Sequence, residues 1–144
     1  MKKLLFIAAA FVVSISAMAQ QKADELIKMN TEKYDFGKIK QGVPVNTVFT
    51  ITNTTNKPVV IENAWASCGC TTPEYSKEPI APGASAKLKV GYNAASMGTF
   101  TKPVYIKLAG IDDPKQVNIT GEVVDANSVT AAPATKATKV KKAS

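Results

Sequence analysis

Residues 85–92, Ser-Ala-Lys-Leu-Lys-Val-Gly-Tyr, decide the fold class. In this stretch Ala86, Leu88, Val90 and Tyr92 alternate with polar residues or glycine. Because successive side chains of a β-strand point to opposite faces, a period of two predicts a strand with one buried and one solvated face. An amphipathic helix would instead repeat its apolar positions every three or four residues.

The same period of two recurs on both sides of this stretch. It is found in residues 44–53, 100–108 and 116–123. Turn-forming residues separate the runs, at residues 40–42, 53–58, 81–83, 96–98 and 112–114. About seven short strands with regular turns, in a segment the size of one small domain, predict an all-β fold, the immunoglobulin-like β-sandwich.

Two residues within the runs carry expectations of their own. Trp65 ends the run 58–66, which we expect to be a central strand, and large aromatic side chains dominate small cores. We therefore expect Trp65 to pack between the sheets; the alternative is an exposed aromatic anchor for binding. Pro103 cannot donate a backbone hydrogen bond, which predicts an edge position or a bulge at that point.

The N-terminus has the three parts of a cleavable signal peptide. Lys2 and Lys3 precede an apolar run at residues 4–13, too short to span a bilayer, and Ala17-Met18-Ala19 supplies the small residues of a cleavage site. A membrane anchor or a buried strand fits less well, because the small residues follow the apolar run directly. We expect an exported protein with a signal peptide over residues 1–19, whose mature chain begins at Gln20.

The remaining chain divides into three parts by composition. We expect a leader with a short helical turn over residues 20–30, the β-sandwich domain over residues 31–124, and a disordered tail over residues 125–144. The tail consists mainly of Ala, Thr, Val, Ser and Lys and has no aromatic residue, so it cannot bury enough apolar surface to order itself.

The positive charge of the chain does not indicate nucleic-acid binding. The formal net charge is +7, but two of the lysines lie in the signal peptide and four in the tail. The lysines are not interleaved with aromatic residues, as they are in many nucleic-acid-binding surfaces. A weak attraction to anionic polymers of the cell envelope remains open.

The residue types present argue against catalysis. The chain contains no histidine, which excludes Ser-His and Cys-His nucleophile pairs and histidine-ligated zinc or copper. The acidic residues are scattered, apart from Asp112 and Asp113, which precede Pro114 in an expected turn. No phosphate-binding glycine motif or dinucleotide fingerprint is present. We expect no enzymatic activity and no cofactor.

Cys68 and Cys70 form the candidate thiol site, in the sequence Ser-Cys-Gly-Cys-Thr. In an extended stretch their side chains share one face. They could close a small ring as a labile disulfide, provide two soft ligands to a thiophilic metal together with Met97 or a second chain, or serve as small packing residues. The sequence leaves these three alternatives open.

The order of motifs resembles a bacterial exported family of unknown function with an S-C-G-C-T signature, which is similar to the Hydin-type and major-sperm-protein-type immunoglobulin-like domains. The resemblance covers nearly all of residues 32–124. It is carried by residues 34–37, Gly42, 49–53, Pro58, 67–71, 80–83, Gly98 and Gly121. It implies a seven-stranded sandwich in the periplasm or cell envelope of a Gram-negative bacterium, and no established activity.

Two functions follow as hypotheses. The first is an exported cell-envelope interaction or structural module, non-catalytic, that offers a sheet edge or a loop end to an envelope protein. The second is a periplasmic thiol-redox or metal-handling protein that uses Cys68 and Cys70. An accessory subunit of a larger assembly differs from the first only in the permanence of the contact.

Overall fold

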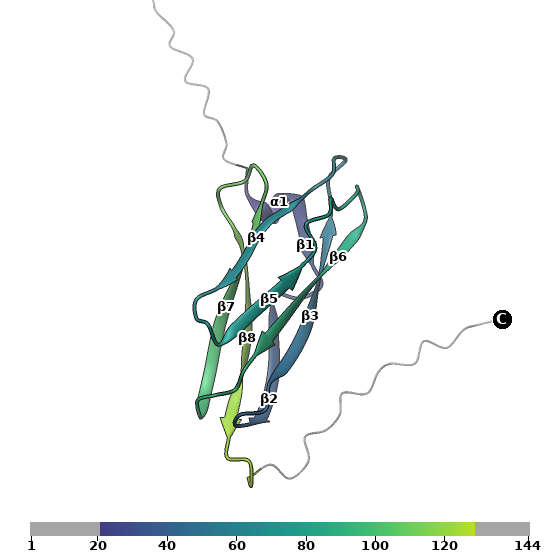
Figure 1. The fold of residues 1–144 in the computed structure, drawn as a ribbon. Helices are drawn as coiled ribbons and strands as arrows, with labels where there is room; N and C mark the ends of the chain where they lie inside the picture. Colours follow the sequence, from purple (N-terminus) through teal and green to yellow (C-terminus); the bar gives the residue numbers. More distant parts are fainter. Residues whose placement is uncertain (1–20, 129–144) are drawn as a thin grey trace, which may run out of the picture.

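The computed structural model describes residues 21–128 (Figure 1). Residues 1–20 and 129–144 lie outside the described part, and with them the expected signal peptide and most of the expected tail. The elements in chain order are α1 (Ala23–Leu26), β1 (Ile27–Met29), β2 (Lys33–Lys40), β3 (Val45–Asn53), β4 (Ile61–Ala66), β5 (Thr71–Tyr75), β6 (Ser85–Tyr92), β7 (Gly98–Leu108) and β8 (Lys115–Val124).

These strands form two four-stranded sheets. The first sheet has the order β1-β3-β6-β5 and the second the order β2-β8-β7-β4. The pair β2–β8 is parallel and all other named pairs are antiparallel. The predicted all-β, immunoglobulin-like sandwich is confirmed, with eight strands in the described residues in place of about seven.

The core lies between the two sheets and follows the period of two. In β6 the side chains of Leu88 and Val90 are fully buried, whereas Lys87 and Lys89 are exposed. The fully buried apolar side chains of the core come from both sheets: Phe49, Ile51, Ile61, Leu88, Val90, Val104, Ile106, Leu108, Val117, Ile119 and Val123. Each predicted turn lies between two successive strands.

The sandwich begins earlier than expected. The sequence predicts a leader over residues 20–30, but within it only residues 23–26 are helical, and Ile27–Met29 is strand β1 of the first sheet. Ile27 and Met29 are buried in the core. Three residues are too few to display a period of two, so the sequence did not reveal this strand.

Pro103 lies at an edge position, as predicted, although its strand as a whole is not an edge strand. Strand β7 lies between β8 and β4, so it is an inner strand. However, β4 pairs only with residues 104–108 of β7. Ala109 donates its N–H to Val60 on the β4 side, and the alternation of an antiparallel ladder directs the backbone of Pro103 to the same side. Proline is therefore tolerated because β4 has already ended at this position.

The chain crosses from the first sheet to the second between β1 and β2. Asn30 ends the first pairing: its N–H donates to the Thr50 carbonyl (3.1 Å), and its side-chain oxygen accepts the Thr50 N–H (2.7 Å). The Glu32 carbonyl then accepts the N–H of Asn118 in β8 (2.8 Å). The crossover is thus attached to both sheets.

The buried Lys115 fixes the crossover further. Its ammonium group forms ion pairs with the carboxylates of Asp24 and Glu32, which lie before and after β1. Burial lowers the pKa of Lys115, but the hydrogen bonds and charges of the two carboxylates outweigh it, and the pKa is raised. The lysine therefore stays charged and holds the N-terminal segment against the start of β8.

Gly121 in β8 allows two close approaches. A Cβ atom at this position would lie 2.8 Å from Cζ of Phe100 and 2.9 Å from the carbonyl oxygen of Gly37. Gly37 sits in the irregular part of β2, with a φ of 66° that favours glycine. The absence of a side chain at position 121 therefore lets the β2 backbone and the Phe100 ring pack together.

We predict that Gly121→Ala lowers the free energy of unfolding by about 1–3 kcal/mol, because the added methyl group has no space. The matched control is Gly91→Ala in β6, where the nearest atom to an added Cβ is the Thr72 oxygen at 3.8 Å. The control should change stability by less than about 1 kcal/mol. Urea unfolding of both variants measures the difference, and equal stabilities would contradict this packing.

Candidate interaction site

The turn between β4 and β5 contains both cysteines. It connects an edge strand of one sheet to an edge strand of the other. Cys68 and Cys70 are joined by a disulfide with a Cα–Cα distance of 5.3 Å. The sequence allows a disulfide, a metal site or two packing residues at these positions, and the structure contains the intrachain disulfide.

The disulfide is half-buried and lies beside the hydroxyl group of Thr71. Both Sγ atoms lie 3.8 Å from the Thr71 hydroxyl. The Cys70 carbonyl accepts the N–H of Asn93, just after β6, at 3.0 Å. Met97, the third ligand considered for a metal, is 61% exposed in the β6–β7 connection. Within residues 21–128 no three His, Cys, Asp or Glu side chains converge as a metal site.

The prediction that Trp65 packs between the sheets is wrong. Its side chain is 37% exposed and stacks on Tyr105 of the neighbouring strand β7, with ring centroids 5.5 Å apart and planes inclined by 23°. Strand β4 is an edge strand and not a central one. We call Trp65 and Tyr105 the aromatic pair.

A register shift in β4 explains why Trp65 faces outward. Ile61 is fully buried, and strict alternation from it would place Trp65 on the inner face as well. The pairing with β7 shifts between Ile61 and Asn63, which moves the following residues by one position. Ala64 and Ala66 then pack against the core, and Trp65 lies on the outer face.

Polar groups surround the aromatic pair. Lys107 and Glu62 form an ion pair at 2.7 Å, and the hydrogen bond to Glu62 is the main cause of a raised pKa at Lys107. The Tyr75 hydroxyl, from β5, donates to the Glu62 carbonyl at 3.4 Å. Gln116 lies opposite Tyr105 in β8. The arrangement is an exposed aromatic centre with a polar rim.

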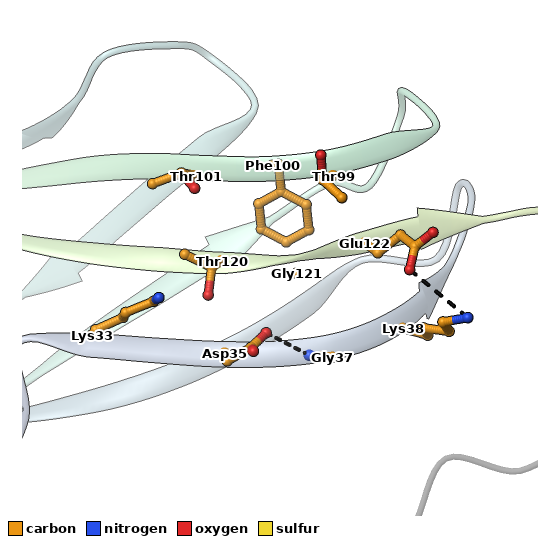
Figure 2. A pocket seen from close by; sticks show the side chains of 10 residues that line it. All are labelled: Lys33, Asp35, Gly37, Lys38, Thr99, Phe100, Thr101, Thr120, Gly121 and Glu122. Carbon is orange, nitrogen blue, oxygen red and sulfur yellow. Dashed lines mark hydrogen bonds and ion pairs between the residues drawn. The ribbon is translucent and has the colours of Figure 1, made fainter.

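A hollow lies at the other end of the same sheet, where β2, β8 and β7 run side by side (Figure 2). It has a volume of about 400 Å³. Its charged side chains are of both signs: Lys38 pairs with Glu122 at 3.9 Å, and Asp35 accepts the N–H of Gly37 at 2.9 Å. The mixed charges favour no single class of ligand, so the aromatic pair is the stronger candidate.

Comparison with protein families identifies the chain. Residues 27–123 match the family "Protein of unknown function (DUF1573)", and the chain belongs to this family. The matched range begins at β1, in agreement with the early start of the sandwich. No curated protein matched the sequence. Among residues 21–128 no helix has the length and apolar character needed to cross a membrane.

Solved structures share the fold at low sequence identity. A protein of unknown function from Porphyromonas gingivalis W83 aligns with a TM-score of 0.59 and 14% identity, over 68% of this chain and 46% of that one. The PapD-like domain 7 of human CEP192 aligns with a TM-score of 0.59 and 6% identity, over 85% of this chain and 99% of that one. The Pseudomonas aeruginosa CupB2 chaperone aligns with a TM-score of 0.51 and 12% identity, over 67% of this chain and 55% of that one.

These likenesses show a PapD-like, immunoglobulin-like fold. This chain spans less than half of the Porphyromonas protein and about half of the chaperone, but nearly all of the CEP192 domain. Such sandwiches carry many unrelated functions. The function has to be argued from the surfaces of this chain.

Proposed function

We propose that this domain is a non-catalytic interaction module of the bacterial cell envelope, and that the aromatic pair is the centre of its contact with a partner protein. The observation that carries the proposal is the exposed Trp65, stacked on Tyr105 on the outer face of a sheet. Tryptophan and tyrosine are enriched among the residues that dominate protein–protein binding.

The surroundings of the aromatic pair suit such a contact. Both residues lie on paired strands, so little conformational freedom is lost on binding. The ion pair of Lys107 and Glu62 lies beside them and supplies a polar rim. The disulfide at Cys68 and Cys70 follows β4 directly and restrains the adjoining turn.

The location in the envelope rests on two features of the sequence and structure. The N-terminal segment has the organisation of a cleavable signal peptide. The disulfide fits an oxidising compartment such as the periplasm. The lack of histidine and of clustered acidic residues supports a role without catalysis.

Site-specific photo-crosslinking in intact cells tests this function. A photoreactive residue in place of Tyr105 should give a defined protein adduct, and the same residue at the exposed Asn56 in the β3–β4 loop should not. Trp65→Ala should remove the adduct at position 105, because it removes the larger ring of the pair. No adduct at position 105, or equal adducts at both positions, would contradict the proposal.

A second candidate function is thiol–disulfide exchange at Cys68 and Cys70. It is favoured by a half-buried disulfide that closes over a single intervening residue. In this reaction the thiolate of a dithiol reductant attacks one sulfur, forms a mixed disulfide and releases the other cysteine as a thiolate. The second thiol of the reductant then displaces the first cysteine, leaving two thiols here and an oxidised reductant.

Alkylation of thiols in freshly lysed cells separates the two functions. A redox role predicts that a measurable fraction of the protein carries two alkylated cysteines, and that this fraction rises when the cells are treated with a dithiol. A bridge with only a structural role stays unalkylated in both samples, and its cysteines react only after the protein is unfolded in the presence of a reductant. The second outcome would exclude the redox function and leave the interaction function untouched.

A further inference from the structure

Strand β3 is only partly paired on one of its two sides. On one side β6 pairs with residues 45–52 of β3, whereas on the other side β1 pairs only with residues 51–53 (Figure 1). The chain leaves this sheet at Asn30 to enter β2 of the second sheet. Within the described residues, the segment 45–49 of β3 therefore has a side without a strand.

The hydrogen bonds at Thr50 show which backbone groups face this side. Both the N–H and the carbonyl of Thr50 bond to Asn30, on the β1 side. In an antiparallel strand alternate residues direct their backbone groups to the same side. Asn46 and Val48 therefore direct their N–H and carbonyl groups to the free side. The two residues are separated by one residue, which is the spacing at which a further antiparallel strand forms its hydrogen bonds.

The free side of β5 is blocked. The Cys70 carbonyl bonds to Asn93 on the β6 side, so alternation directs Thr71, Pro73 and Tyr75 to the free side. Pro73 has no N–H to offer at the centre of this five-residue strand. Proline in an edge strand is a common protection against unwanted pairing.

The edges of the second sheet are protected by other means. In β4 the Glu62 carbonyl already accepts the Tyr75 hydroxyl, and the register shifts at Ile61 and Asn63. Strand β2 combines an irregularity at residues 35–38 with Lys33, Lys38 and Lys40. Lysines and bulges both oppose the addition of a strand. In contrast, residues 45–49 of β3 contain no proline, no charge and no register shift.

The surface beside the free side of β3 is basic. Lys28, Lys87 and Lys89 lie on the outer face of the first sheet, with Glu74 as their only acidic neighbour among the named strands of that sheet. Lys89 pairs with Glu74 at 3.3 Å, whereas Lys28 and Lys87 form no ion pair with any residue in the range 21–128. Lys87 lies opposite Thr50, the residue bonded to Asn30, and is therefore diagonal to the free segment 45–49.

Apolar groups border the same side. Val48 is 44% exposed on the outer face. Val45, at the start of β3, is only partly buried at the margin of the core. The inward-facing residues of an added strand would cover Val45.

We propose that residues 45–49 of β3 bind an extended segment of a partner polypeptide in which apolar and acidic residues alternate. The backbone of the segment pairs with Asn46 and Val48, its acidic side chains face Lys87 and Lys28, and its apolar side chains face Val45. A backbone separation of about 10 Å across two strands is within reach of a lysine and a glutamate side chain together. This site lies on the opposite sheet from the aromatic pair and does not depend on it.

A second copy of this chain fits the site less well. Pairing of two β3 edges would bring the same lysines of both copies together, at a cost in free energy. A contact of five residues also buries far less than the area of about 1,200 Å² that is typical of stable interfaces. A partner with acidic residues is therefore the better occupant.

Selection from a phage-displayed library of random 12-residue peptides tests the site on the mature protein. The enriched sequences should alternate apolar residues with Asp or Glu. Their synthetic consensus peptide should bind less tightly as salt is raised, because the lysines contribute through charge.

Three variants locate the binding. Val48→Pro removes a donor on the free side without breaking a bond to β6, and should weaken binding of the consensus peptide about tenfold or more. Lys87→Glu should weaken it several-fold and reverse the effect of salt. Lys77→Glu is the matched control, an exposed lysine in the β5–β6 connection, and should bind like the unaltered protein.

The proposal is overturned if no peptides are enriched, if they lack the alternation, or if Lys87→Glu and Lys77→Glu bind equally well. Lys87→Glu alters only a surface charge, so this comparison holds even if Val48→Pro fails to fold. A concentration-dependent dimer that Lys87→Glu strengthens or Val48→Pro abolishes would assign the edge to a second copy and overturn the peptide proposal.

Discussion

The crossover at residues 30–32 is the constraint on which the rest of the structure depends. Asn30 closes the pairing with β3 through its backbone and its side chain, and Glu32 begins the contact with β8 and Lys115. Because the chain changes sheets here, β1 is short, β2 can run parallel to β8, and half of β3 has a free side. The close approach of Gly37 to Gly121 is a consequence of the same β2–β8 pairing.

The fold class could be predicted because it rests on a local property. The alternation at residues 85–92 reflects a strand whose inner face contacts the core, and the structure buries Leu88 and Val90 as expected. The turns could be predicted for the same reason, since glycine and proline act on the backbone at their own positions. The predictions of the fold class and of the turns do not depend on which strands pair.

The features that the sequence did not reveal depend on pairing. The outward position of Trp65 results from a register shift against β7, which has no signal in β4 itself. Pro103 is tolerated within an inner strand because β4, far away in sequence, ends next to it. The disulfide between Cys68 and Cys70 is one of several alternatives that the sequence allows, and it lies in the turn where the chain passes from one sheet to the other. Sequence reasoning found the cysteines, but it treated the exposed Trp65 only as the alternative.

The two proposed contact surfaces lie on opposite sheets, so the domain is suited to hold two partners or two parts of one. The crossover at Asn30 leaves one side of β3 free within the described residues. Hydrogen exchange of individual backbone amides, followed by NMR on the free mature protein, tests it most directly. We expect rapid exchange at Asn46 and Val48 and slow exchange at Thr47, Phe49 and Thr50, whose N–H groups are bonded. Protection at Asn46 and Val48 as strong as at Phe49 would contradict it.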